Sequence, residues 1–464
     1  MPNLRLPHAM DALRPQLGVL VAGVESRLPY GAALLSAKQG LRISVNDREE
    51  QVTEQAPSAG TVISAFDGTT MHEAAYGGFD YTKIERAMRQ LLQDLGPLGD
   101  RTIDPGPQRR GDFITPMEIA PDSLSIEEKL DRCRALHRRV RAMDERIVNA
   151  QIHYTEIGEL SIFCNRAADL AQRVQRLRLT VMVAVASPDG VRYDWTSKDA
   201  TGGWEALEYA DDELRRVIDN AIALLSAERI EPGEYTIITA PGVTGTICHE
   251  SFGHGVETDM FLKQRAKAAG FVDRAVGAPL VDIWDDPSYP AAYGGYFFDD
   301  EGMLAAPTQI VERGVFRRGI TDLYSAQALD VARSANGRRQ DWSRKTYARM
   351  SATFFAAGTT PVADLFAQVD RGIYLTKWSS GMEDPQGWGI QVTCHYGFEI
   401  KNGQLTGRTF APIGISGYVP AVLQSISAVG DDWSLDGGGC FKGHKEWVAV
   451  SSGGPHLLLK ARLG

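Results

Sequence analysis

Two histidines and a glutamate, His249, Glu250 and His254, lie within six residues of one another. Neutral imidazole is the commonest protein ligand for Zn²⁺, and metallopeptidases keep a general base directly after the first ligand. The histidines are five residues apart. At roughly 100° per residue, a regular helix would therefore turn their rings about 140° apart. We expect the helix to bulge or end between them, which Gly253 and Gly255 permit.

The same residues could form only a polar helix end, and three further features favour a metal site. Residues 235–240 form an apolar, strand-like run that leads into the motif through a Pro-Gly turn. Glu257 and Asp259 follow the motif as acceptors for hydrogen bonds from the ligand imidazoles. A glycine-rich loop near the C-terminus supplies candidates for a third ligand.

That loop, residues 436–444, holds two competing donors. Cys440 follows three glycines, which let the backbone come close enough for a thiolate to bind a metal. His444 lies in the same loop, and His395 lies in a predicted hairpin upstream. From the residues alone, the choice between them stays open.

Other polar and aromatic residues are candidates for substrate contacts. Residues 299–301 are three acids that could bind a cation, but no further ligand spacing supports this, and a turn is the preferred interpretation. Arg338 and Arg339 could hold a peptide's C-terminal carboxylate by forked hydrogen bonds, or lie in a solvated loop. Trp378 and Trp388 could form a wall for a specialised substrate.

Local patterns predict the elements that must position these residues. Apolar periodicity predicts helices over 10–29 and 81–95, and a serine at 123 or 125 caps another that runs to about 143. Strands are expected over 147–156, 159–165 and 172–187, with a turn at Asp189–Gly190, and a helix over 211–227. Hairpins are expected to turn at Asp67–Gly68 and Asn402–Gly403.

These elements predict an α+β protein of three parts. We expect a small N-terminal α+β domain over 10–95 and a Gly/Pro-rich linker over 96–122. A central α+β domain follows over 123–228, and a β-rich, metal-binding catalytic domain over 229–464.

Composition narrows the class of protein. The formal charge of −10 argues against nucleic acid or an anionic membrane as the main partner. No apolar run approaches the ~20 residues of a membrane span, and the N-terminus lacks the layout of a signal peptide. Five scattered cysteines are too few for a disulfide framework, so we expect a cytoplasmic protein with reduced cysteines.

The stretch from His249 to Asp259 resembles the H-E-x-x-x-H-G-x-E-x-D signature of the TldD/PmbA family, specifically of its TldD-type metallopeptidase subunit. The sister TldE (PmbA) subunits lack this motif. The resemblance extends over nearly the whole chain. Further blocks that are similar to the family, in the family's order, are residues 299–302, 334–339, 414–417, 426–431 and 437–440.

The resemblance implies a zinc metallopeptidase with one Zn²⁺ per chain. It selects Cys440 as the third ligand beside His249 and His254, which leaves one open position on a tetrahedral zinc, with Glu250 as general base. Lys442 also matches a residue common in the family, without an assigned role. TldD-type subunits work as heterodimers with a TldE-like partner and enclose the site in a chamber. That favours short, unfolded or modified peptides, including peptide natural products during maturation.

Other functions stay open at this point. The same site could serve a zinc amidase or deacylase that acts on a small acylated metabolite. The chain could also be a noncatalytic, TldE-like scaffold, or its metal could be purely structural. A homodimer is the alternative to the heterodimer, and the peptide bond that is cleaved is not identified by the sequence.

Overall fold

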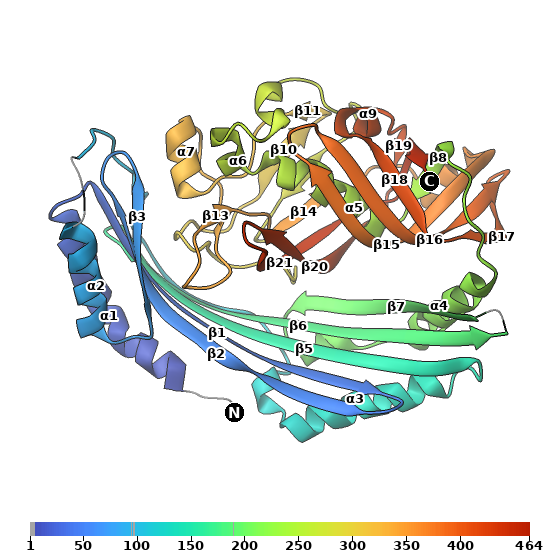
Figure 1. Cartoon of the computed structure of the whole chain (residues 1–464), viewed down its shortest axis with the longest axis horizontal. Coiled ribbons are helices and arrows are strands. Elements are labelled where there is room, and N and C mark those ends of the chain that lie inside the picture. The colour runs from blue at the N-terminus through green and yellow to red at the C-terminus, as the bar shows by residue number, and fades with distance from the viewer. Residues whose placement is uncertain (1–4, 94, 96–97, 189) are drawn as a thin grey trace.

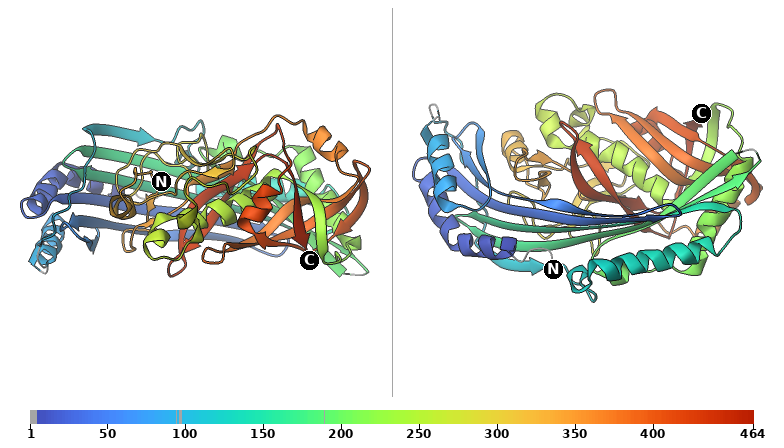
Figure 2. Two further views of the ribbon diagram at one scale, coloured as in Figure 1. Left: turned by 90° about the horizontal axis from the view of Figure 1, so that it is seen from above. Right: turned by 60° about the horizontal axis from the view of Figure 1, so that its bottom comes forward.

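The computed structural model of the chain describes residues 5–93, 95, 98–188 and 190–464, and it has an α+β fold (Figure 1). Within this part of the chain, one long curved sheet forms the base of the molecule, and a β-rich C-terminal domain sits on its concave face (Figures 1 and 2). The C-terminal domain carries the histidine motif and the glycine-rich loop.

The long sheet has the strand order β3–β2–β1–β5–β6–β4, with β7 paired to β6. Its strands are β1 (Tyr30–Asn46), β2 (Glu50–Phe66), β3 (Met71–Gly77), β4 (Arg109–Ile114), β5 (Ile147–Asn165), β6 (Ala168–Ser187) and β7 (Gly190–Thr201). β1 pairs with β2 on one side and with β5 on the other, with Ala33 opposite Cys164. The first and the central module therefore contribute to a single sheet.

Four helices cover the convex face of this sheet (Figure 2). They are α1 (Arg5–Glu25), α2 (Tyr81–Gln93), α3 (Ile126–Arg141) and α4 (Asp211–Ala223). α1 and α2 pack over one end, against alternate residues of β1 such as Leu35, and α3 and α4 over the other end, against Ile43. The intervening residues of β1, such as Leu34, face Phe298 of the C-terminal domain. Along β1 both faces of the sheet are thus covered, and the alternation of its side chains fixes which layer each of them enters.

The C-terminal domain wraps two sheets around one central helix, α5 (Pro241–Phe252). One sheet has the order β15–β8–β22–β18–β16–β17, with β19 paired to β22, and the other β11–β10–β9–β14–β21–β20. The first comprises β8 (Gly233–Thr239), β15 (Arg371–Asp384), β16 (Gly389–Lys401), β17 (Gln404–Phe410), β18 (Ile413–Tyr418), β19 (Ala428–Val429) and β22 (Leu457–Leu463). The second comprises β9 (Ile283–Asp285), β10 (Thr308–Glu312), β11 (Val315–Phe316), β14 (Ala352–Phe355), β20 (Ser434–Lys442) and β21 (Glu446–Gly454). Val243, Ile247, Cys248 and Phe252 of α5 belong to the main hydrophobic core, so this helix is held from all sides.

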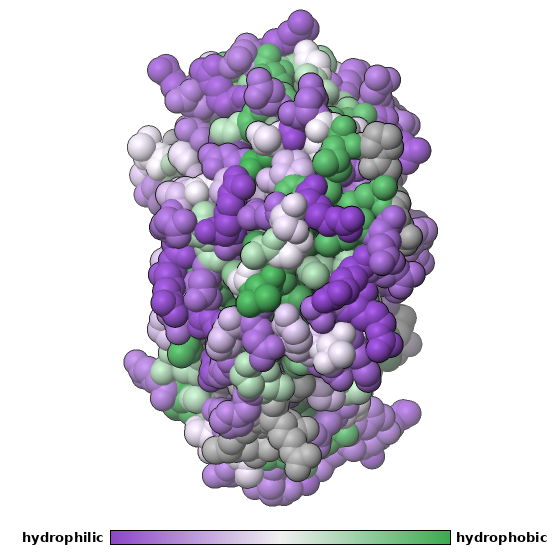
Figure 3. Space-filling model, turned by 90° about the vertical axis from the view of Figure 1, so that its left-hand side faces the viewer, coloured by the Kyte–Doolittle hydropathy of each residue, from purple (hydrophilic) through white to green (hydrophobic). Residues whose placement is uncertain are grey.

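Short elements complete this domain. They are α6 (Thr258–Leu262), α7 (Leu323–Leu329), α8 (Val362–Ala367), α9 (Val419–Gln424), β12 (Gly337–Arg338) and β13 (Tyr347–Ala348). No helix in the described part of the chain is both long enough and apolar enough to span a membrane. Among the described residues, the end of the molecule at α1 and α2 presents mostly polar side chains, with small apolar groups between them (Figure 3).

Local signals predicted several of these elements well. Ser125 caps α3 in a reciprocal box with Glu128, and β2 and β3 turn at Asp67–Gly68, as expected. Asn402 and Gly403 both have positive φ, which the tight turn between β16 and β17 requires. The first helix ends at Glu25, earlier than predicted, and the two strands expected over 147–165 are one strand, β5.

The segment expected as a linker carries a strand. Within residues 98–122, β4 pairs in parallel with β6, so this part of the segment extends the long sheet. Residues 96 and 97 of that segment, and Asp189 of the predicted turn, lie outside the described residues. The division of the chain into three domains at the expected boundaries stays a prediction.

A buried ion pair joins α3 to the long sheet. Lys129 Nζ lies 2.8 Å from both carboxylate oxygens of Glu156, and the hydroxyl of Tyr154 donates to the same carboxylate. Removing one partner leaves the other charge buried without compensation.

We expect Lys129→Met to destabilise the sheet by about 3 kcal/mol, because Glu156 then loses its counter-ion in an apolar layer. The double variant Lys129→Met/Glu156→Leu should recover most of that loss. Chemical unfolding followed by circular dichroism measures both, with Lys83→Met at an exposed lysine as control. Equal stability of Lys129→Met and the wild type would contradict a structural role for the pair.

Candidate metal centre

The helix that carries the histidines ends between them, as the five-residue spacing predicts. α5 ends at Phe252, Gly253 caps it with φ −97° and ψ −80°, and His254 begins a separate 3₁₀ turn. A Cβ at position 253 would collide with the carbonyl of His249 and the sulfur of Met350. Glycine is therefore required for the chain to fold back here and bring both rings to one place.

Three potential ligand atoms converge at this helix end. The rings of His249 and His254 lie 5.1 Å apart, nearly perpendicular at 84°, and Cys440 Sγ lies 3.4 Å from His254 Nε2. The nitrogen and sulfur atoms all lie within 4.8 Å of one another, and no further such group occurs in the described residues. Two imidazoles and a thiol with this spacing fit a tetrahedral Zn²⁺ that keeps one position open.

Cys440 comes from the hairpin of β20 and β21, where it pairs with Val448. Burial alone would raise the pKa of its thiol, but the facing imidazoles of His254 and His249 reverse this and hold the pKa well below its usual value. The thiolate is the form that binds metal, so the protein prepares this sulfur for coordination.

A buried charge network lies behind His254. Its Nδ1 is 3.3 Å from Glu257 Oε2, which leaves Nε2 turned toward Cys440. Lys442 Nζ lies 2.9 Å from Glu257 and 2.5 Å from Asp259. Burial would raise the pKa of Glu257, but Lys442 and His254 outweigh it and lower the pKa to about 2. Glu257 is therefore ionised and fixes the ring orientation of its histidine.

The roles of two residues in this network differ from those expected from the sequence. Asp259, expected to accept a hydrogen bond from a ligand imidazole, instead pairs with Lys442 and Lys263. Lys442, for which no role was assigned, compensates both acids. Its place beside the metal site depends on a contact between segments 183 residues apart, which local spacing does not encode.

Arg349 holds the hairpin that carries Cys440. Its guanidinium is fully buried and donates to the carbonyl of Cys440 at 2.8 Å and to that of Glu446 at 3.3 Å. Its role in holding the hairpin was not predicted from the sequence. Removing a donor to two backbone carbonyls would loosen the ligand's own strand.

Glu250 lies beside the three potential ligands on the buried face of α5. Burial raises the pKa of Glu250, and the neighbouring histidines offset part of the increase. Gly381 of β15 packs directly on its carboxylate, at a distance that no larger residue would allow. A carboxylate in such a place can take a proton from a water molecule next to the ligands.

A second carboxylate near the site was not foreseen. Glu383 also lies on β15, and both its oxygens are buried without a hydrogen-bonding side chain among the described residues. Burial raises its pKa well above the usual value, and the backbone N–H of Gly255 approaches it. No strand was predicted over this stretch from the sequence, whereas β15 runs to Asp384.

The site opens into a cavity of about 780 Å³. His249, Glu250, His254, Glu257, Cys440 and Lys442 line its inner part. Trp378, a predicted substrate contact, also lines it, together with Met382 and Phe441, which are 66% and 59% exposed. A cavity of this size holds several residues of an extended peptide.

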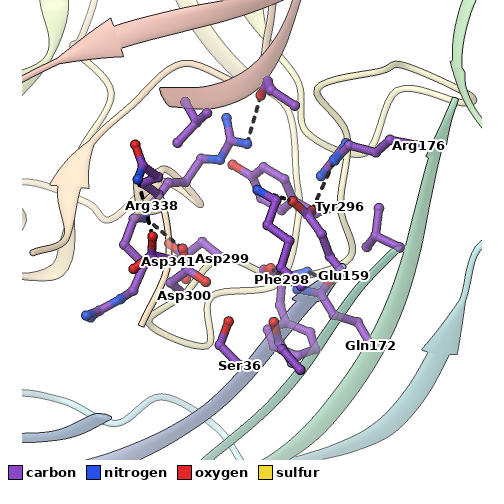
Figure 4. A pocket seen from close by; sticks show the side chains of 18 residues that line it. Ser36, Glu159, Gln172, Arg176, Tyr296, Phe298, Asp299, Asp300, Arg338 and Asp341 are labelled. Carbon is purple, nitrogen blue, oxygen red and sulfur yellow. Dashed lines mark hydrogen bonds and ion pairs between the residues drawn. The ribbon is translucent and has the colours of Figure 1, made fainter. Parts of the chain in front are cut away.

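The other predicted substrate contacts lie elsewhere. Arg338 donates to the carbonyls of Met350 and Ala449 and, with Arg339, lines a second cavity of about 60 Å³ at the junction with the long sheet (Figure 4). Trp388 is fully buried and packs against Phe252. These three residues therefore lie outside the lining of the metal cavity, because tertiary packing, which local sequence patterns do not encode, decides their surroundings.

The remaining polar candidates also lie away from the metal centre. Asp299 accepts backbone N–H groups from Glu301, Met303 and Gly337, which confirms the turn that was preferred for residues 299–301. His395 donates to the carbonyl of Tyr193, and His444 is exposed at the tip of the β20–β21 hairpin. Of the three candidates for the third ligand, the structure brings only Cys440 to the histidines.

Two segments of the chain match models of one protein family. Residues 232–462 match the PmbA/TldA metallopeptidase C-terminal domain, and residues 119–227 match the central domain of the same family. A metalloprotease of Synechocystis is 25% identical over 97% of this chain and 98% of its own. A protein of Saccharolobus solfataricus, named a zinc metalloprotease TldD homolog, is 29% identical over 49% of this chain and 51% of its own.

Solved structures share the fold. A Thermotoga maritima protein, described as a putative modulator of a DNA gyrase, superposes with a TM-score of 0.81 at 19% identity, covering 98% of this chain and all of its own. TldE from Thermococcus kodakarensis superposes with a TM-score of 0.76 at 16% identity, with the same coverage. At these identities the likeness establishes the α+β architecture.

Lys442→Met should weaken zinc binding by about 10- to 100-fold, the usual effect of removing a group that orients a ligand. Without this lysine, Glu257 and Asp259 repel each other and no longer hold His254 in place. Competition with a chromogenic chelator measures the affinity. Lys445→Met, at an exposed lysine of the same hairpin, should leave the affinity unchanged, and a matching loss in both variants would refute the role assigned to Lys442.

Proposed function

Because the chain belongs to the PmbA/TldA metallopeptidase family, we propose that it is a zinc-dependent peptidase of the TldD type, which hydrolyses short, unfolded or modified peptides. The observation that carries this proposal is the convergence of His249, His254 and Cys440 beside Glu250, in a cavity large enough for a peptide. The relative named a zinc metalloprotease supports the choice of metal.

The three converging side chains would hold one Zn²⁺ per chain. Two imidazoles and one thiolate are ligands that zinc prefers, and three protein ligands are the number found in hydrolytic sites. A zinc ion bound there supplies a Lewis acid that polarises a carbonyl and acidifies water. Glu257, through His254, and Arg349, through the carbonyl of Cys440, keep two of the ligands in place.

Glu250 would move the proton. Its carboxylate is buried beside the ligands, lines the cavity and is held by the close contact with Gly381. It would take a proton from a water molecule in the cavity as general base and then give that proton to the leaving amine. The intact ligand set and the general base favour this function over a noncatalytic scaffold and over a structural metal.

We extend the proposal to a partner subunit. The chain would act with a TldE-like protein as a heterodimer, which encloses the cavity and admits unfolded chains rather than folded proteins. The shared architecture with TldE of Thermococcus kodakarensis supports a pairing of two similar subunits. Maturation of a peptide natural product is the cellular process that such a site would suit.

Elemental analysis of protein purified without added metal tests the ligand set. We expect about one zinc per chain in the wild type and a strong loss in Cys440→Ala, because two imidazoles alone bind zinc weakly. Cys394→Ala, at a buried cysteine outside the site, is the matched control and should keep its zinc. Full zinc content in Cys440→Ala would shift the third ligand to His444 or His395.

The variant Glu250→Gln should keep its zinc and lose activity by at least about 100-fold, since an amide cannot act as general base. Cleavage is measured by mass spectrometry on a panel of peptides and acyl-amino acids, with zinc content determined on the same samples. Glu231→Gln, at an exposed glutamate, is the control. Turnover of acyl-amino acids without turnover of peptides would replace the peptidase by a deacylase.

A further inference from the structure

The metal cavity has an uneven distribution of accessible charge. All three acidic residues that line it, Glu250, Glu257 and Glu383, have buried carboxylates. Glu257 is further neutralised by Lys442. Two exposed bases also line the cavity, Lys263, which pairs with Asp259, and Arg265. The cavity therefore offers an accessible cationic group to a substrate, although the formal charge of the whole chain is −10.

The two bases follow the short helix α6. Arg265 is exposed, and its guanidinium forms no hydrogen bond, ion pair or ring contact with any residue that the structure describes. Lys263 lies two residues before it, with its amino group 3.0 Å from Asp259 and over the ring of Tyr347. The guanidinium of Arg265 therefore has hydrogen-bond donors available at the wall of the cavity. Lys263, which is close by in the chain, is already paired with Asp259.

Large apolar side chains of the same lining come from other elements. Met382 lies on β15 and Phe441 on β20, and both are more than half exposed. An exposed apolar surface beside a catalytic cavity is typical of a place where substrate side chains bind. The lining thus combines apolar surface with a cationic group that has no partner of its own.

We propose that Arg265, assisted by Lys263, binds a carboxylate of the substrate and makes the cavity selective for peptides that carry one near the scissile bond. The geometry of a guanidinium matches a carboxylate through two parallel hydrogen bonds, which fixes both position and orientation. This inference rests on the proposed peptidase function, and it gives to Arg265 the task that the sequence analysis considered for Arg338 and Arg339. The carboxylate belongs either to the C-terminus of a short peptide or to an acidic side chain.

Peptide binding to the zinc-loaded Glu250→Gln protein, which does not turn over, tests the inference by calorimetry. The probes are acetylated pentaalanine with a free C-terminus, its C-terminal amide, and the amide with one alanine replaced by glutamate. Adding Arg265→Gln should weaken binding of the free acid by about tenfold, the loss of one charge-assisted contact, and leave the plain amide unchanged. The same selective loss with the glutamate peptide would identify the side-chain carboxylate as the source.

Arg229→Gln, at an exposed arginine outside the cavity lining, is the matched control and should change no affinity. The inference would be overturned if Arg265→Gln weakened binding of the free acid and of the plain amide equally. It would also be overturned if the variant changed the affinity for neither the free acid nor the glutamate peptide. Zinc-dependent cleavage of the amide by the wild type, without preference for the acid, would leave the peptidase proposal standing and remove Arg265 from it. Carboxylate-selective binding without cleavage of any peptide would support the role of Arg265 and overturn the peptidase proposal.

Discussion

The site depends on one geometric constraint, the convergence of side chains that are far apart in the sequence. His254 and Cys440 are 186 residues apart, yet their ligand atoms lie 3.4 Å apart. Helix α5 is held between two sheets by its apolar residues, and the hairpin of Cys440 is itself part of one of those sheets. The close packing of this core fixes the helix end against the hairpin, because a shift of either would open voids or cause collisions.

Buried charge specifies the same arrangement. Glu257, Asp259 and Lys442 lie behind the ligands, where each ion costs several kcal/mol to bury unless its partners are in place. Arg349 adds a fully buried guanidinium that donates to carbonyls of the ligand hairpin. The ion pairs of Lys442 join residues that closely follow α5 in the chain to the hairpin of β20 and β21. Hydrogen bonds and ion pairs depend more strongly on the relative position of α5 and the β20–β21 hairpin than apolar packing does. The charge network therefore adds to the apolar core a requirement for the correct placement of these two elements.

The sequence predicts the features of the site that depend on local chemistry. The five-residue spacing of the histidines required a broken helix, and the structure breaks it at Gly253. The capping box of Ser125 and the turn at Asn402–Gly403 follow from residue types with one preferred backbone conformation. The end of β15 was not predicted, because periodicity does not distinguish a short stretch of strand from an extended loop.

Tertiary context explains what the sequence could not provide. Arg338 and Arg339 were candidates for binding a carboxylate, but both are buried and direct donors to the protein itself, as the neighbouring Arg349 does. A buried guanidinium must donate its hydrogen bonds to acceptors within the protein, whereas an exposed guanidinium can donate to water and remains available to a ligand. Residue type alone does not separate these cases, and burial does.

The charge of the cavity follows from the same requirement. Glu257 must be ionised to orient His254, and Lys442 compensates it, so the two charges balance each other within the wall of the cavity. Of the two bases after α6, Lys263 pairs with Asp259, and Arg265 is left without an acidic partner among the described residues of the lining. A cavity with low-dielectric walls focuses the field of such charges, which can oppose the field of the acidic surface around it. Anionic groups of a substrate would thus be drawn inward although the chain as a whole repels them. The internal compensation that builds the metal site would in this way also decide the charge that its substrate meets.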